Sequence, residues 1–316
     1  MSSTGFPDSV AEPTGGPTPI TTSESEVPIA ISEAISNAGK PPTPEGICDA
    51  GEMKLTRCAD LHPIRYSDLA RLLADFKGAV ATGSDVVYFS GVPKDLFETG
   101  IRRARDRGKL QHRKARLTYI ASGLLVVATP SKRYEVAQMR LCLYLQQQAG
   151  QMGLKKVLPG GASSSVAASG STSEPDGCFF GNGFSSNPTT VIEVAASQSA
   201  LTIKGAIWCT VPGVKAVLLC NIQAEKRTIT ITKVVPTLQD NRTRSGLKLC
   251  PKVVARIVVR SVEGAPGVYE LDPELDQAIT LALGDVTDEA APAGGEPDFA
   301  FSKAILQEWA EVVLSV

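Results

Sequence analysis

The chain has 316 residues, of which 43% are apolar and 21% are charged, a composition typical of a globular protein with a substantial core. The formal net charge of −1 excludes a strong overall field of the kind that attracts nucleic acid or membranes, so any such surface must be local. We find no secretory leader pattern and no apolar run near the roughly 20 residues that cross a bilayer. We therefore expect an intracellular protein of the nucleus or cytoplasm, neither secreted nor inserted in a membrane.

Cysteine and histidine usage argues against a structural metal centre. The seven cysteines are an odd number with no C-x-x-C pair, so we expect reduced thiols and no zinc site. The two histidines, His62 and His112, are too few for a histidine-rich centre.

Composition divides the chain into three parts. Residues 1–55 are rich in Ser, Thr, Pro and Gly and are predicted to be a disordered tail, because they cannot bury enough apolar surface to offset the ordering entropy. Residues 56–270 form the predicted folded domain. Residues 271–316 contain an acidic loop and an amphipathic helix.

The first half of the domain alternates helices and short strands. We predict a helix over 67–76 that begins at Ser67, a strand over 86–90 and a basic helix over 95–108. Residues 117–130 are predicted to form two short strands around a Ser-Gly turn.

A second helix is predicted from Pro130-Ser131 to Gly150. Its predicted apolar stripe consists of Val136, Met139 and Leu143, and Glu135 lies beside that stripe.

The second half contains the strongest strand signals. Strands are predicted at 175–180 and 189–196, and a helix follows from Ser197 or Ser199 to about 211. A wholly apolar run over 215–222 is typical of a buried strand. The alternating run over 226–235 predicts a half-exposed edge strand, and 251–262 is a further strand candidate.

Two carboxylates stand out in these strands. Alternate residues of a strand share a face, so Val191, Glu193 and Ala195 should point one way. A carboxylate in such an apolar run is costly to bury without a partner. The turn at 181–188 can bring Asp176 close to Glu193, and a divalent cation would relieve their repulsion. Oxygen ligands favour Mg²⁺ or Mn²⁺.

A lysine lies in the apolar stripe of the helix that follows. Leu201, Lys204, Ile207 and Trp208 share one face of that helix. Lys204 can either extend its ammonium to solvent or reach over the sheet, where Ala195 leaves room beside Glu193.

The order of these features resembles the PD-(D/E)XK nuclease superfamily, and within it a restriction endonuclease family common in bacteria and also found in fungi. The matching segments are GLLVVATPSKRYEVAQ, EPDGCFF, VIEVAASQS and the helix lysine Lys204. They lie within residues 115–235, and we take the chain to resemble a fungal-type member.

The resemblance implies a restriction endonuclease-like α/β fold, with a mixed central sheet flanked by helices. It also implies a metal-dependent nuclease that hydrolyses phosphodiester bonds of nucleic acid, with DNA as the expected substrate. Asp176, Glu193 and the backbone carbonyl of Val194 would bind Mg²⁺ or Mn²⁺. Lys204 would orient or polarise the attacking water, and Glu135 would be an auxiliary acid.

The sequence departs from the family pattern at two places. Ala195 occupies the position of the motif lysine, and no acidic residue shortly precedes Lys204. Gln198 is a second polar candidate for the vacant role. Each candidate also has an ordinary explanation, because Asp176 could be a turn residue, Glu193 a solvent-facing strand residue and Lys204 a surface lysine. Likewise, Glu135 suits the first turn of any helix.

A separate basic run precedes this core. It contains Arg102, Arg103, Arg105, Arg107, Lys109, Arg113, Lys114 and Arg116. Such a run can follow nucleic-acid phosphates, serve as a nuclear localisation patch or form a solvated helix face.

Three hypotheses remain open at this stage. The chain is a metal-dependent nuclease, a catalytically degenerate nucleic-acid-binding or scaffolding protein on the same fold, or an unrelated α/β protein with a coincidental motif. A homodimer is compatible with all three, and no segment marks a dimer face. Two structural features distinguish the three hypotheses. They are the distance between the Asp176 and Glu193 carboxyl groups and the direction of the Lys204 side chain.

Overall fold

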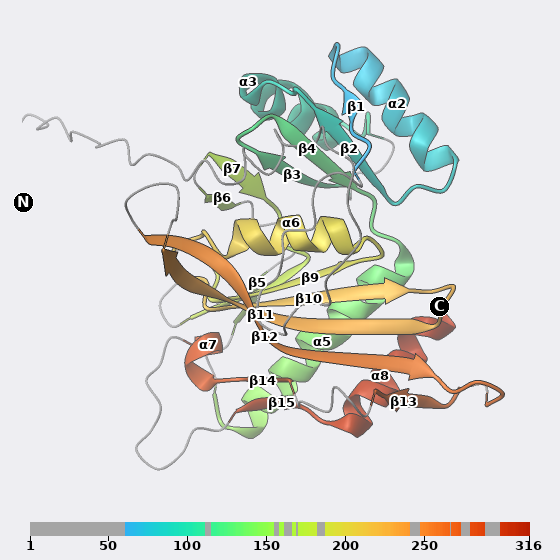
Figure 1. Ribbon diagram of the computed structural model, residues 1–316, viewed down its shortest axis with the longest axis vertical. Helices are drawn as coiled ribbons and strands as arrows, with labels where there is room; N and C mark the ends of the chain where they lie inside the picture. Colours follow the sequence, from blue (N-terminus) through green and yellow to red (C-terminus); the bar gives the residue numbers. More distant parts are fainter. Residues whose placement is uncertain are drawn as a thin grey trace, which may run out of the picture.

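The computed structural model places two sheets in layers, with helices between and outside them (Figure 1). It describes residues 61–110, 115–154, 158–160, 166–168, 170–181, 187–240, 247–265, 267–272, 279–287 and 298–316. The predicted fold class, an α/β protein with a mixed sheet flanked by helices, is confirmed. The predicted disordered tail, residues 1–55, lies outside the described residues.

The first sheet has six strands in the order β1-β2-β4-β3-β7-β6. These are β1 (Ile64–Arg65), β2 (Val86–Ser90), β3 (Arg116–Ile120), β4 (Leu124–Ala128), β6 (Val166–Ala168) and β7 (Ser171–Ser173). The predicted hairpin is β3 and β4, and its turn uses Gly123 at φ +84°, a conformation that glycine adopts without strain.

Short helices cover the outer face of this sheet: α2 (Leu69–Ala81), α3 (Lys94–Leu96), the π-helical turn η2 (Phe97–Ile101) and α4 (Arg102–Asp106). Phe76, Phe89 and Leu117 are among the buried residues that join these helices to the sheet. Asp68 caps α2 by accepting a hydrogen bond from the Arg71 N–H, so the expectation that Ser67 is the cap is wrong by one residue.

The second sheet has seven strands in the order β13-β12-β11-β10-β9-β8-β5. These are β5 (Leu158–Gly160), β8 (Gly177–Phe180), β9 (Thr190–Ala195), β10 (Ala216–Gln223), β11 (Thr228–Asp240), β12 (Leu247–Ser261) and β13 (Tyr269–Leu271). Strands β9 and β10 are parallel, and the other neighbours are antiparallel.

Strand β11 is not the edge strand that its alternating sequence predicted. It pairs with β10 on one side and with β12 on the other. Its Lys233 donates to the Thr280 carbonyl and to Asp285. The neighbouring segments therefore cover the face that a sequence pattern assigns to water.

Helix α6 (Gln198–Trp208) connects β9 to β10 and lies between the two sheets (Figure 1). Ser197, one of the two expected caps, accepts a hydrogen bond from the Ala200 N–H at 3.2 Å. Every residue from Ala200 to Trp208 is buried, because the helix contacts β9 and β10 on one side and β7 on the other.

Helix α5 (Lys132–Gln151) covers the opposite face of the second sheet and begins at Ser131 as predicted. Its predicted apolar stripe is wrong at two of three positions, because Met139 and Leu143 are 52% and 42% exposed, whereas Val136 packs against the core. The face that packs on the sheet instead contains Ala137, Leu141, Leu145 and Ala149.

The end of the chain packs on this same face. It contributes β14 (Ile279–Leu281), α7 (Leu283–Thr287), β15 (Phe299–Phe301) and α8 (Lys303–Ser315). The Trp309 indole donates to the Ala137 carbonyl at 3.2 Å, which joins α8 to α5. No helix within the described ranges is long and apolar enough to cross a membrane.

Candidate active site

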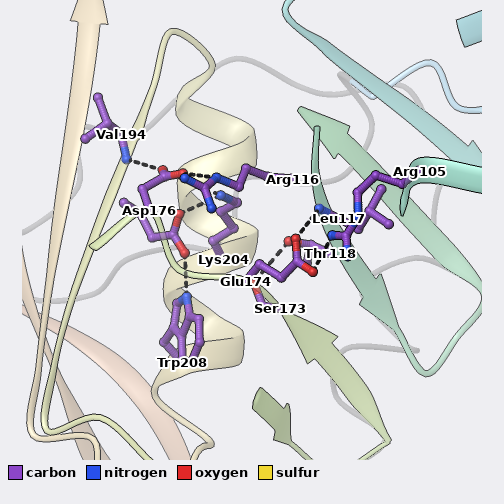
Figure 2. A network of polar contacts seen from close by, with 11 residues as sticks. Arg105, Arg116, Leu117, Thr118, Ser173, Glu174, Asp176, Val194, Lys204 and Trp208 are labelled. Atoms are coloured by element: carbon purple, nitrogen blue, oxygen red, sulfur yellow. Dashed lines mark hydrogen bonds and ion pairs between the residues drawn. The ribbon is translucent and has the colours of Figure 1, made fainter. Parts of the chain in front are cut away.

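The chain crosses from the first sheet to the second through three residues, Glu174, Pro175 and Asp176. Strand β7 ends at Ser173 and β8 begins at Gly177. This crossing places Asp176 just before β8, beside β9, where its Oδ2 accepts a hydrogen bond from the Val194 N–H at 2.8 Å (Figure 2). In a regular strand the N–H and C=O of one residue point to the same edge, so the Val194 carbonyl also faces this side.

Glu193 points from β9 toward α6, as the alternation of the strand predicts. Val191 and Ala195 pack on the α6 side, whereas Ile192 and Val194 pack on the α5 side. Glu193 has 0% exposure, so the alternative of a solvent-facing residue is wrong. Its two oxygens accept separate hydrogen bonds, both from α6.

Lys204 is the first of these two donors. Its Nζ lies 2.5 Å from Glu193 Oε2 and 3.7 Å from Asp176 Oδ2. The two predicted carboxylates therefore meet at one ammonium group. Because Lys204 is only 3% exposed, the alternative of a surface lysine is wrong.

Trp208 is the second donor, and the sequence analysis did not assign it a polar role. Its Nε1 donates to Glu193 Oε1 at 2.6 Å (Figure 2). The available signal was its spacing, since Trp208 follows Lys204 by four residues and therefore projects from the same face of the helix.

Burial and charge act in opposite directions on this pair. Burial raises the pKa of Glu193, and the nearby Lys204 acts to lower it. Burial acts to lower the pKa of Lys204, but Asp176 and Glu193 hold that pKa above its ordinary value. The lysine is therefore charged at neutral pH.

A pocket opens beside these groups, with about 520 Å³ of non-protein space that includes open solvent. Its walls come from the second sheet, from α5 and α6 and from β2, β3 and β4 of the first sheet. The lining residues are Asp85, Val86, Arg116, Val126, Ala128, Thr129, Pro130, Tyr134, Glu135, Gln138, Asp176, Val194, Ala195, Ala200 and Lys204.

The pocket unites three of the predicted site side chains, because Asp176, Lys204 and Glu135 all line it. Glu193 lies behind Lys204 and does not line the pocket. Gln198, the second candidate for the role of the missing lysine, does not line it either.

Arg116 also lines the pocket, where its Nε lies 3.6 Å from Asp176 Oδ1 (Figure 2). The sequence analysis placed Arg116 in the basic run as a nucleic-acid contact and gave no sign that it approaches Asp176. The two residues are far apart in sequence and belong to different sheets, because Arg116 begins β3 of the first sheet and Asp176 directly precedes β8 of the second.

The rest of the basic run divides into two groups. Arg102 lies over the Phe97 ring, and Arg105 pairs with Glu174, so these two pack against the protein. The exposed members are Arg103, Arg107 and Lys109. Arg113 and Lys114 lie outside the described residues.

The family resemblance implies a divalent cation at Asp176 and Glu193. Asp176, Glu193 and the Val194 carbonyl offer oxygen ligands, which Mg²⁺ and Mn²⁺ prefer. Each Glu193 oxygen accepts one hydrogen bond from α6, and a carboxylate has about four acceptor positions, so capacity remains. The residues therefore fit such a cation, although Lys204 and Arg116 already neutralise the carboxylates. No group of three or more His, Cys, Asp or Glu side chains gathers in metal-binding positions among the described residues.

Comparison with known proteins gives little beyond this geometry. No family model and no curated protein matches the chain. Four solved chains match, and one is titled a "putative nuclease belonging to DUF820" from Anabaena variabilis. It is 14% identical with a TM-score of 0.35, over 61% of this chain and 90% of that chain. A likeness this low carries no argument about function, and the fungal-type assignment stays a prediction.

Proposed function

We propose that this protein is a metal-dependent nuclease that hydrolyses phosphodiester bonds of nucleic acid, with DNA as the expected substrate. The observation that carries the proposal is the position of Lys204. Its ammonium lies within 4 Å of both Glu193 and Asp176, at distances of 2.5 and 3.7 Å. A helix residue thus supplies the cation that Ala195 cannot supply from the strand.

Each side chain has a distinct role in this proposal. Lys204 donates a hydrogen bond to the attacking water or the phosphate and offsets the negative charge that develops there. Trp208 acts as a positioning residue, because it donates to Glu193, the carboxylate that also contacts the lysine. Glu135, on the α5 wall of the pocket, accepts the proton of the water.

Asp176, Glu193 and the Val194 carbonyl would hold Mg²⁺ or Mn²⁺. When bound, the cation supplies Lewis-acid polarisation of the phosphate oxygens and neutralises charge between the carboxylates.

Plasmid cleavage tests the proposal. The wild type, Asp176→Ala and Glu193→Ala are incubated with supercoiled plasmid in Mg²⁺ or Mn²⁺, with EDTA as the blank. We expect nicking by the wild type and a loss of at least about 100-fold in both variants, the usual effect of removing a group that stabilises the transition state. Equal cleavage by all three proteins would refute the site.

A second candidate is the catalytically degenerate nucleic-acid-binding or scaffolding protein. It is favoured by the balanced charge of the site, where Lys204 and Arg116 face Asp176 from two sides. A cation must compete with both of them. Nucleic-acid binding by the wild type, without cleavage in either metal, would support this candidate over the nuclease.

A further inference from the structure

Two arginine–carboxylate pairs lie side by side at the crossing between the sheets, and they differ in how tightly they are closed (Figure 2). In the first pair, Arg105 contacts Glu174 directly, and Glu174 also accepts from the Leu117 N–H at 3.4 Å. Glu174 is 4% exposed and does not line the pocket. This pair joins α4 to the end of β7.

The second pair, Arg116 and Asp176, has a longer contact, although Arg116 also makes a further interaction. Its Nε–Oδ1 distance is 3.6 Å, which is too long for a hydrogen bond, and both residues line the pocket. Asp176 already accepts a hydrogen bond from Val194 and faces the Lys204 ammonium. Arg116 is therefore one of several groups that contact this carboxylate.

The basic side chains that line the pocket are Arg116 and Lys204, among the described residues. Lys204 is directed inward and donates to Glu193. Arg116 comes from the opposite wall, at the start of β3, and its side chain is 17% exposed. A planar guanidinium at a pocket wall suits the paired oxygens of a phosphate group better than a lysine does.

We propose that Arg116 is a phosphate-binding residue of this pocket. Its guanidinium exchanges the 3.6 Å contact with Asp176 for the phosphodiester group, which leaves the carboxylate to the cation. This inference rests on the proposed function for its ligand, nucleic acid, but binding through Arg116 does not require cleavage.

Binding without turnover tests the proposal. Fluorescein-labelled DNA, as a short duplex and as its single strand, is titrated with the protein in EDTA at several salt concentrations, and anisotropy is recorded. Arg116→Met is expected to weaken binding about tenfold, and to reduce the slope of log K against log salt by about 0.9 for the duplex or about 0.7 for the single strand. Arg116→Lys should keep the slope and recover part of the affinity, because lysine keeps the positive charge but lacks the paired N–H donors of the planar guanidinium.

Arg105→Met is the matched control, because it also removes a partly buried arginine from a carboxylate at this crossing. It should leave affinity and slope unchanged. A wild-type affinity and slope in Arg116→Met, for a variant whose circular dichroism is native, would overturn the proposal. So would the absence of binding by the wild type.

The outcomes separate this inference from the proposed function. Arg116-dependent binding without cleavage in Mg²⁺ or Mn²⁺ would refute the nuclease and leave the phosphate contact standing. Cleavage by the wild type, with an unchanged KM and salt slope in Arg116→Met, would refute the phosphate contact and leave the nuclease standing.

Discussion

Replacing Lys204 by methionine tests the central contact of the site. The substitution keeps an unbranched apolar stem and removes the ammonium that lies 2.5 Å from Glu193. Glu193 then keeps the Trp208 hydrogen bond but has no cation in contact, at 0% exposure. An unpaired carboxylate in such a place takes up a proton rather than stay charged.

The expected loss of stability follows from that proton. The pKa of Glu193 is ordinarily 4.5; in the wild type burial raises it while the charge of Lys204 acts to lower it, so removing that charge raises the pKa of Glu193 further. Each pH unit above the unfolded pKa adds about 1.4 kcal/mol to the cost of keeping the folded group neutral. Lys204→Met should therefore lose at most about 3 kcal/mol at pH 7 and at most about 1 kcal/mol at pH 5, because the wild type already bears part of this cost through its own raised Glu193 pKa. A raised folded pKa means that the variant regains stability as the pH falls.

Urea unfolding followed by circular dichroism at pH 5 and pH 7 measures both values. The double variant Glu193→Gln with Lys204→Met has no titrating group at this position, so its free energy of unfolding should change less between pH 5 and pH 7 than that of Lys204→Met. Lys226→Met, at an exposed position, should change the free energy of unfolding by at most about 0.5 kcal/mol. An equal loss at both pH values in Lys204→Met would refute the dependence of Glu193 on this lysine.

Three further variants test other contacts by the same unfolding assay. Trp208→Phe keeps an aromatic ring but removes the indole N–H that donates to the buried Glu193 carboxylate, and should lower the free energy of unfolding by about 1–3 kcal/mol. No loss would argue against that hydrogen bond. Gly205→Ala would bring its Cβ within 3.0 Å of a leucine side chain and should destabilise the protein, whereas Gly78→Ala, with open space in α2, should stabilise it by about 0.5–1 kcal/mol. Leu141→Ala should lose about 2–5 kcal/mol and Leu143→Ala at most about 0.5 kcal/mol; the reverse order would restore the apolar stripe that the sequence predicts.

The strands and helices around the site were predictable because their signals are local. The apolar runs predict β9 and β10, and serine caps mark the starts of α5 and α6. The inward direction of Glu193 follows from strand alternation alone. These features depend on neighbours within a few residues, which a sequence displays directly.

The failures have a common cause, which is packing between distant segments. Two stripes of α5 have helical spacing, and the larger side chains favoured the wrong one. Helix α5 instead presents its alanines to the sheet, which permits a close approach: a Cβ on Gly177 would lie 2.8 Å from the Cys142 sulfur. Arg116 was missed for the same reason, because only the stacking of two sheets brings it to Asp176.

The packing of the two sheets also explains how Lys204 of α6 can take the role of the motif lysine, whose position in the strand is occupied by Ala195. On a helix with one open face, Lys204 would extend its ammonium into water and leave the carboxylate unpaired. Helix α6 has no such face, because β7 of the first sheet covers the side that the second sheet leaves open. Confined in this way, the lysine reaches the charge of Glu193. The first sheet is therefore part of the site, although the sequence motif lies mostly in the second.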